Sequence, residues 1–184
     1  MEVSSTLSDR AILNLIGDNP DGGFRLLLKR FKEPVYWHIR RITVVHSDAE
    51  DALQETFLRI YRSLSGLRKE MSLTAWIFRI ATNEALRLRE RNRNFAFSLD
   101  DAAVSDVHAI MSEDYVDYSD LEAVRLQQAI LSLPPKQQLA FNLRYYDEFD
   151  YATIAEITGS TVSGVKANYH AAKEKIIRFM NSHD

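Results

Sequence analysis

The chain has 184 residues, of which 46% are hydrophobic and 27% charged, and its formal net charge is −3. This length suits one medium domain or two small ones, and the composition excludes a chain that is disordered throughout. The absence of cysteine excludes disulfides, thiolate catalysis and cysteine-based zinc sites, and it fits a reducing cytoplasm.

The charge is divided unevenly along the chain. Residues 1–95 hold 16 Lys or Arg and 12 Asp or Glu, residues 96–120 hold seven acids and no Lys or Arg, and residues 121–184 hold seven of each. No apolar run approaches membrane-spanning length, and the N-terminus is polar and acidic. We therefore expect a cytoplasmic protein without membrane insertion. Its N-terminal half is basic, although the net charge of the whole chain is negative.

The first 43 residues predict two helices. Ser8 or Asp9 can cap a short helix that ends at Gly17, and the run Asn-Pro-Asp-Gly-Gly at 19–23 predicts a turn. A longer helical pattern follows at 24–42, in which Pro34 predicts a kink or an interruption.

An acidic helix is predicted next, with Ser47 or Asp48 as its N-cap and acidic residues in its first turn. Its apolar residues recur at spacings of three and four and form one buried stripe between 49 and 64. An outward Leu58 is unexpected on a face that only meets water, so it indicates a contact surface. The outward face carries Asp51, Gln54, Glu55 and Leu58.

A basic helix is predicted at 73–93. Trp76 lies on its apolar face, which favours core packing over base contact, whereas Arg79, Asn83 and Arg87 lie four residues apart on another face. Five arginines and two glutamates lie between positions 76 and 93, and such a face suits phosphates. A solvated surface helix is the alternative interpretation.

Residues 96–120 show no sustained period, so we predict a flexible acidic linker with a short helical piece at 104–112. The linker is either a plain solvated tether or a strand of acids that mimics nucleic acid in a basic channel of a partner.

Helical patterns resume at Leu121, and Pro134–Pro135 mark a stop and a restart. Asp150 is a predicted N-cap, the turn around Gly159 is tight, and a last helix is predicted at 162–180. Two helices joined in this way are typical of a helix-turn-helix, although many helix hairpins bind no DNA. The free face of the last helix carries Ser163, Lys166, Ala167 and His170, flanked by Asn168, Ala171 and Lys173.

Nothing in the sequence favours an enzyme. The acidic pairs at 100–101 and 113–114 lie in the least structured stretch, where nothing would hold two carboxylates at a fixed separation. The five histidines are dispersed, and no metalloprotease, nucleophile-elbow or phosphate-loop motif is present. We expect no catalytic residues, no metal site and no cofactor.

Four stretches, in this order and spacing, resemble the extracytoplasmic-function (ECF) group of bacterial RNA polymerase sigma factors. DAEDALQETFLRIYR (48–62) resembles the region 2 helix that docks on core polymerase, and residues 73–93 resemble the promoter-melting and minus-10 segment. LSLPPKQQLAFNLR (131–144) resembles the start of region 4, and residues 150–175 resemble its minus-35-binding helix-turn-helix.

The resemblance implies an all-α fold with two small helical domains. Residues 1–95 would form the region 2 helical bundle, 96–120 the linker, and 121–184 the region 4 helix-turn-helix domain. The chain would be a dissociable initiation subunit that directs core RNA polymerase to specific promoters. Its implied partners are the clamp helices of the largest polymerase subunit, the flap of the second, promoter DNA and an anti-sigma factor.

The resemblance also assigns residues to these partners. Polymerase would be bound by Asp48, Asp51, Gln54, Glu55 and Leu58. The minus-10 element would be bound by Trp76, Arg79, Asn83, Arg87 and Arg91, and the minus-35 element by Ser163, Lys166, Ala167, Asn168, His170 and Lys173.

In the last helix this chain departs from the family, because Asn168 and Ala171 stand where arginines are common. The departure lowers the expected phosphate attraction of that helix. The alternative to a sigma factor is a two-domain regulator that binds DNA through the helix-turn-helix and does not bind core polymerase. An acidic docking face and a basic tryptophan-bearing helix in the same chain argue against that alternative.

Overall fold

The computed structural model describes residues 8–66, 72–96 and 121–182. Within these ranges the chain forms α-helices, one short 3-10 turn at Leu64–Gly66 and no strand, which confirms the predicted all-α fold. The predicted linker from 97 onward, with its helical piece, lies outside the described residues. The helices are α1 (Asp9–Asp18), α2 (Pro20–Thr43), α3 (His46–Ser63), α4 (Leu73–Ala96), α6 (Leu121–Leu131), α7 (Pro135–Tyr145), α8 (Tyr151–Thr158) and α9 (Val162–Asn181).

Helix α1 begins as predicted, because the Ser8 hydroxyl accepts a hydrogen bond from the backbone N–H of Ala11. The predicted turn at 19–23 is instead the start of α2. Asn19 caps α2 by accepting from the N–H of Gly22 at 3.0 Å, and a proline follows at the first helical position. A Cβ on Gly23 would lie 2.8 Å from the backbone of Ile16, so glycine allows α2 to approach α1 closely.

The predicted interruption at Pro34 is absent, because α2 runs without a break from Pro20 to Thr43. Pro34 itself is exposed, whereas Phe31 and Val35 on either side of it are buried in the core. Packing of these neighbours stabilises the helix against the loss of one backbone hydrogen bond at the proline.

The predicted N-cap of α3 is wrong, since α3 begins earlier, at His46, and its cap residue Val45 makes no side-chain hydrogen bond. The chain turns sharply at Val44, whose φ of 69° is rare for a β-branched residue. Val44 is 5% exposed and packs against side chains of α6, including Leu131. The tight turn at Val44 therefore determines where α3 starts.

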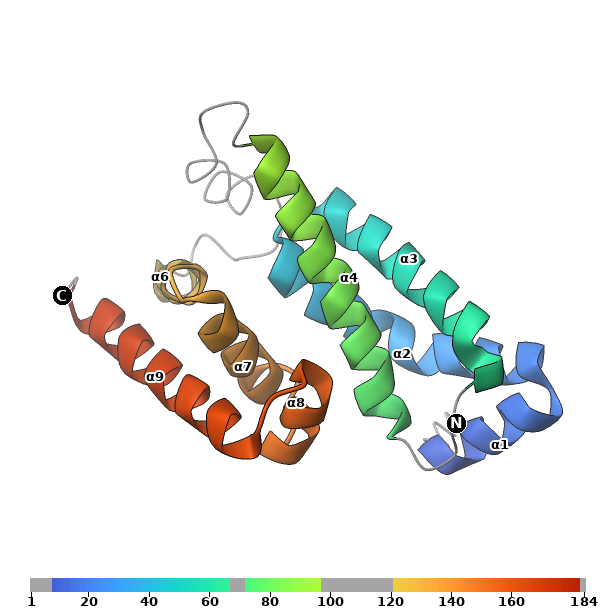
Figure 1. The fold of residues 1–184 in the computed structure, drawn as a ribbon. Helices are drawn as coiled ribbons and strands as arrows, with labels where there is room; N and C mark the ends of the chain where they lie inside the picture. Colours follow the sequence, from blue (N-terminus) through green and yellow to red (C-terminus); the bar gives the residue numbers. More distant parts are fainter. Residues whose placement is uncertain (1–7, 67–71, 97–120, 183–184) are drawn as a thin grey trace, which may run out of the picture.

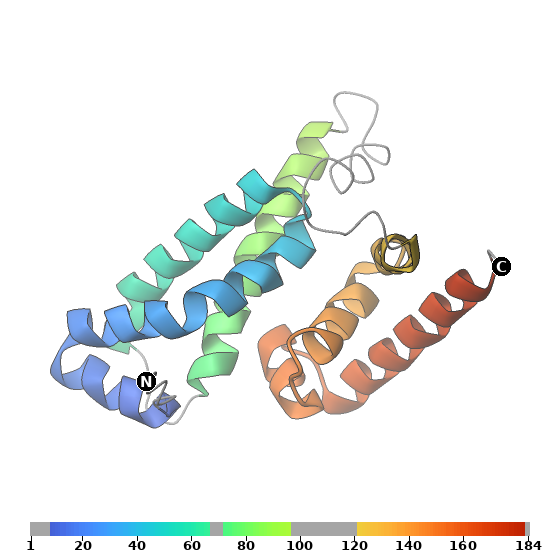
Figure 2. The ribbon, with the colours of Figure 1, turned by 180° about the vertical axis from the view of Figure 1, so that it is seen from behind.

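Helices α1 to α4 form one bundle, and α6 to α9 lie beside it as a second group (Figure 1). The second group has its own apolar cluster, which includes Phe141, Ala172 and Ile176. Other residues of this group, among them Leu143 and Ile154, belong to the core cluster of the first bundle. The two groups are packed against each other, with α8 against α4, as the view from behind also shows (Figure 2).

Among the helices of the described ranges, none combines the length and the apolar character that crossing a bilayer requires.

Candidate functional site

An exposed polar stripe runs along α4. Arg79, Asn83, Arg87 and Arg91 are all exposed, and their spacing of four places them on one side of the helix. Trp76, predicted with them, is only partly exposed and packs against the core, as its place on the apolar face predicted. The α4 stripe, as we call these four exposed residues, thus offers three guanidinium groups and one amide to a ligand.

A buried carboxylate pairs with one arginine of the α4 stripe. Glu84 has a side chain that is 4% exposed, and its Oε2 accepts a hydrogen bond from Arg87 Nη2 at 2.6 Å. Its other oxygen, Oε1, lies 2.7 Å from Arg59 Nε on α3. An unpaired carboxylate at this depth would be costly, so the two arginines satisfy it and tie α3 to α4.

The residues predicted to bind polymerase divide into two sets on α3. Asp51, Gln54 and Leu58 are exposed, and Leu58 retains 43% of its accessible surface. The other two have side-chain partners, Asp48 on α4 and Glu55 within α3 itself. Asp48 Oδ2 accepts from Asn92 Nδ2 at 2.6 Å, and Glu55 pairs with Arg59 at 3.3 Å.

Gln54 and Leu58 lie on the edge of an apolar groove between α2 and α3, with a volume of about 820 Å³. Two lysines of α2 and Glu50 of α3 contribute charge to its walls. Tyr61 closes one part of the groove and donates to Asp21 Oδ1 at 3.1 Å; this bond, together with the carboxylate charge, raises the pKa of the Tyr61 phenol. The α2–α3 groove is lined by Phe24, Leu28, Lys29, Lys32, Glu50, Leu53, Gln54, Phe57, Leu58 and Tyr61.

Helices α8 and α9 have the predicted helix-turn-helix connection. Asp150 caps α8 by accepting from the N–H of Thr153 at 2.7 Å, and this bond lowers the pKa of the Asp150 carboxyl. Gly159 ends α8 in the left-handed conformation at φ 65°, and Thr161 caps α9 through the N–H of Gly164. These caps confirm the predicted turn and fix where α9 begins.

On α9, five of the six predicted minus-35 residues are exposed: Ser163, Lys166, Ala167, His170 and Lys173. Asn168 is different, because its side-chain amide donates back to the carbonyl of Gly164 at 3.0 Å. The ammonium of Lys166 lies 5.6 Å from the ring centre of Tyr151 on α8, which holds it near the start of α9.

The sequence analysis missed a polar network between the two helical groups. His38 of α2 is fully buried; its Nδ1 lies 2.8 Å from Asp147 Oδ2 and its Nε2 lies 2.8 Å from the Thr82 hydroxyl of α4. Arg41 Nη1 donates to Asp147 Oδ1 at 3.0 Å. His38 and Asp147 are 109 residues apart, so no local pattern could have linked them.

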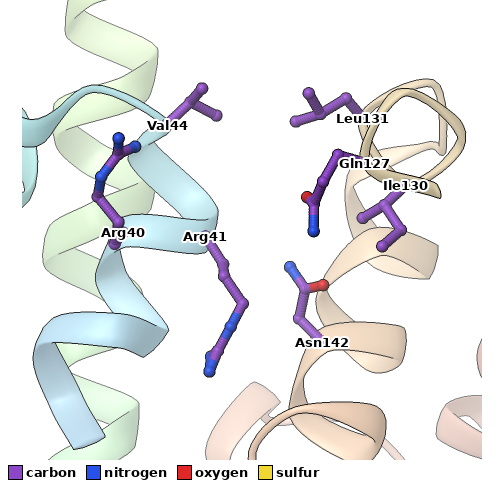
Figure 3. A pocket seen from close by; sticks show the side chains of 7 residues that line it. All are labelled: Arg40, Arg41, Val44, Gln127, Ile130, Leu131 and Asn142. Atoms are coloured by element: carbon purple, nitrogen blue, oxygen red, sulfur yellow. The ribbon is translucent and has the colours of Figure 1, made fainter. Parts of the chain in front are cut away.

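Beside this network is a small cavity of about 10 Å³, comparable with the space that one water molecule needs (Figure 3). Arg40 and Arg41 of α2 and Val44, the residue after that helix, line one side, and residues of α6 and α7 line the other (Figure 3). Asn142 is 2% exposed, and its buried side-chain oxygen has no hydrogen-bond partner among the residues that the structure describes. The cavity is too small for a metabolite and belongs to the packing between the two groups.

Two family models match this chain. The model described as Sigma-70 region 2 matches residues 27–95, which cover most of α2 and all of α3, and the model described as Sigma-70, region 4 matches residues 123–176, which include the helix-turn-helix. Together the two matched ranges account for more than half of the chain.

Curated relatives that match most of this chain are ECF RNA polymerase sigma factors. An ECF RNA polymerase sigma-E factor of Haemophilus influenzae is 26% identical over 182 residues, which is 95% of this chain and 96% of the relative. The sigma-E factor of Escherichia coli K12 is 28% identical over 95% of each chain. The ECF sigma factor SigW of Bacillus subtilis is 28% identical over 79% of this chain and 82% of its own.

Two solved structures share the fold. CnrH, in complex with the cytosolic domain of CnrY, superposes with a TM-score of 0.73 at 17% identity and covers 96% of this chain and 99% of its own. The sigma factor RpoE of Bartonella quintana, in complex with the anti-sigma factor NepR, has a TM-score of 0.65 at 21% identity, covering 86% of this chain and 96% of its own.

These comparisons support the sigma-factor prediction and not the stand-alone regulator. The region 2 and region 4 matches lie in the order that the four sequence stretches predicted, and relatives of the same kind match nearly end to end. The chain belongs to the ECF group of the sigma-70 family of bacterial RNA polymerase sigma factors.

Proposed function

We propose that this sigma factor binds core RNA polymerase through α3, holds the opened minus-10 strand on α4 and reads the minus-35 duplex with α9. One observation carries the proposal: a single chain presents the exposed α4 stripe, the α2–α3 groove and a capped helix-turn-helix. A regulator that only binds duplex DNA has no use for the first two.

On α4, the stripe supplies cationic groups for the phosphates and a hydrogen-bonding group for the bases of an unstacked DNA strand. Guanidinium groups at positions 79, 87 and 91 attract phosphates, and the Asn83 amide can hydrogen-bond a base edge. Glu84 holds Arg87 in one orientation, which lowers the entropy lost when a phosphate binds. We propose that Trp76 supports this surface from the core and does not stack on a base.

On α3, we propose that polymerase contacts Asp51, Gln54 and Leu58 together with the adjoining groove. Leu58 is an exposed apolar residue on the edge of this apolar groove, and such surfaces mark protein partners. Asp48 is bonded to Asn92 of α4, so its role is to hold α3 on α4, whereas Glu55 pairs within α3 with Arg59 and keeps 37% of its side-chain surface exposed.

The proposed partners are core polymerase, through the clamp helices of its largest subunit and the flap of its second, promoter DNA and an anti-sigma factor. Complexes with an anti-sigma factor or with CnrY are described for the two structural relatives. The protein would act in the cytoplasm, where polymerase and DNA are found.

The test is co-migration of the purified protein with bacterial core RNA polymerase on a sizing column. Asp51→Arg places a cation on the exposed face of α3 and should abolish co-migration without unfolding the chain. Asp18→Arg makes the same charge change at the exposed end of α1 and should leave binding intact. Equal binding by all three proteins would contradict the docking face.

A further inference from the structure

The start of α4 is capped by two side chains from different parts of the chain. The Ser72 hydroxyl accepts a hydrogen bond from the backbone N–H of Ala75 at 3.2 Å, as an ordinary N-cap does. The N–H of Thr74 is bonded instead by a residue 65 positions earlier, because Asp9 Oδ2 accepts it at 3.2 Å. The same oxygen accepts from the Thr74 hydroxyl at 3.0 Å. A carboxylate of α1 therefore completes the N-terminal cap of α4.

Asp9 also joins a third helix to this contact. Its other oxygen, Oδ1, lies 2.8 Å from Arg30 Nη2 of α2. Asp9 is itself the first residue of α1, so the N-terminal ends of α1 and α4 meet at one carboxylate, and both views show the start of α4 beside α1 (Figures 1 and 2). Helix N-termini and a guanidinium both attract a negative charge, so Asp9 draws α1, α2 and α4 together.

Other polar contacts of α4 lie further along the helix and lead to α3. Glu84 pairs with Arg59, and Asn92 Nδ2 donates to Asp48. The Asp9 contact holds the opposite end of α4 and leads to α1 and α2. Apolar packing is non-directional, whereas a hydrogen bond to a backbone N–H requires the two heavy atoms to lie about 2.7–3.2 Å apart. Asp9 therefore fixes the position of α4 along its own axis.

The α4 stripe begins close to this contact. Arg79, its first residue, follows Thr74 by five positions, which is about 7.5 Å along a helix. Helix α4 runs without a break from Leu73 to Ala96, so a shift of its first turn moves the whole stripe. The groups of a binding site must be held within about 0.5 Å of the productive geometry. The position of the first turn thus decides whether the stripe fits a DNA strand.

We propose that Asp9 is a positioning residue for the minus-10 strand and acts through Thr74 on the α4 stripe. The inference rests on the proposed function of that stripe. In this role Asp9 does not touch DNA, and it sets the position at which the guanidinium groups and the Asn83 amide are presented. Its loss weakens strand binding, whereas docking of polymerase on α3 and reading of the minus-35 duplex by α9 are unaffected.

A matched set of variants separates positioning from stability. Asp9→Ala removes the second cap of α4 altogether. Asp9→Asn keeps an acceptor oxygen for the Thr74 N–H but loses the charge that pairs with Arg30. Ser8→Ala is the control, because it removes the cap of α1 one residue earlier and leaves the contacts of Asp9 with Thr74 in place. The control therefore loses a helix cap at the same end of the bundle without releasing α4.

The test is binding of each variant holoenzyme to a fluorescein-labelled non-template strand, which spans the minus-10 element of a promoter mapped by transcription in vitro. Binding is measured well below the unfolding temperature of each variant, after co-migration has shown equal incorporation into polymerase. Asp9→Ala should weaken strand binding about fivefold, the effect of one typical hydrogen bond, and Asp9→Asn about twofold. Ser8→Ala should bind the strand as the parent protein does.

Hydrogen exchange of the backbone amides in the free protein gives a second readout. Asp9→Ala should speed exchange in the first turn of α4, whereas Ser8→Ala should speed it only in the first turn of α1. Faster exchange in α4 with unchanged strand binding would mean that Asp9 only stabilises the bundle, and it would overturn the positioning role.

Thr74→Val removes the hydroxyl at nearly constant volume, and with Asp9→Asn it keeps the inference testable if Asp9→Ala does not fold. It should weaken strand binding about twofold in the parent protein and have no effect in the Asp9→Ala background, because the two residues act as one unit. Additive losses would mean that Thr74 contacts the strand independently, and they would overturn the inference.

Arg79→Ala in the same assay separates failure of the inference from failure of the proposed function. If Arg79→Ala weakens strand binding and the Asp9 variants do not, the stripe binds the strand without positioning by Asp9, and the inference alone fails. If the parent holoenzyme does not bind the strand, the proposed function fails and the inference fails with it.

Discussion

Glu84 and Arg87 are joined by two hydrogen bonds, from Arg87 Nη2 at 2.6 Å and from Arg87 Nε at 3.2 Å, to the same carboxylate oxygen. The other carboxylate oxygen of Glu84 forms a salt bridge with Arg59 of α3. A single buried acid thus joins the helix proposed to bind polymerase to the residue proposed to bind the opened strand.

Glu84→Gln should lower the stability of the bundle. The amide cannot pair with two guanidinium groups, although both arginines are partly solvated, so we expect a loss of about 1 kcal/mol. For a bundle of this size that corresponds to a fall of about 4–8 °C in Tm, measured by thermal unfolding. Glu90→Gln, an exposed change on the same helix, is the matched control and should leave Tm unaltered.

Arg79→Ala should weaken open-complex formation by the holoenzyme. Loss of one phosphate contact should reduce the slope of log affinity against log salt by about one. The measurement is promoter binding by the variant holoenzyme over a range of salt. Arg10→Ala removes an exposed arginine from α1 and serves as the control. An unchanged slope for Arg79→Ala would remove Arg79 from the proposed strand-binding face.

Lys166→Ala should weaken use of promoters that depend on a minus-35 element. Its ammonium is held beside Tyr151 near the start of α9, where a groove-bound helix contacts DNA. Promoters that do not need this element should be affected less. Lys175→Ala, further along the same helix, is the matched control, and an equal loss in both variants would indicate a general charge effect.

Asp150→Ala should destabilise the helix-turn-helix by removing the cap of α8. The pKa of Asp150 is lowered by its bond to the Thr153 N–H, so its contribution is present above the ordinary pKa of 3.8. The contribution is lost as the pH falls through the lower pKa of the folded state. The difference in Tm between wild type and variant should therefore shrink in acid, whereas Glu156→Ala, exposed on α8, should show no such pH dependence.

Local signals in the sequence predicted local structure well. Asp150 and Gly159 occupy the cap and turn positions that their residue types favour, and the helix-turn-helix follows from them. The predicted interruption at Pro34 did not form because propensity is weaker than the packing of its buried neighbours. The start of α3 was misplaced because it depends on Val44, which is held by packing against α6.

Contacts distant in sequence could not be predicted in this way. Asp48 was assigned to polymerase binding by the resemblance, but its bond to Asn92 of α4 is revealed only by the packing of the bundle. His38 looked like one of several dispersed histidines until the fold placed it against Asp147. The buried and exposed faces of a helix can be predicted from the periodicity of its sequence. The side chains that it contacts on other helices can be identified only from the tertiary structure.

The most direct test of the account is transcription in vitro on fragmented genomic DNA from the source organism, with sequencing of the transcript 5′ ends. Core polymerase with the added protein should start at discrete sites that share sequence elements about 10 and 35 base pairs upstream, and Asp51→Arg should abolish those starts. Start sites that do not differ from those of core polymerase alone would contradict the sigma-factor account.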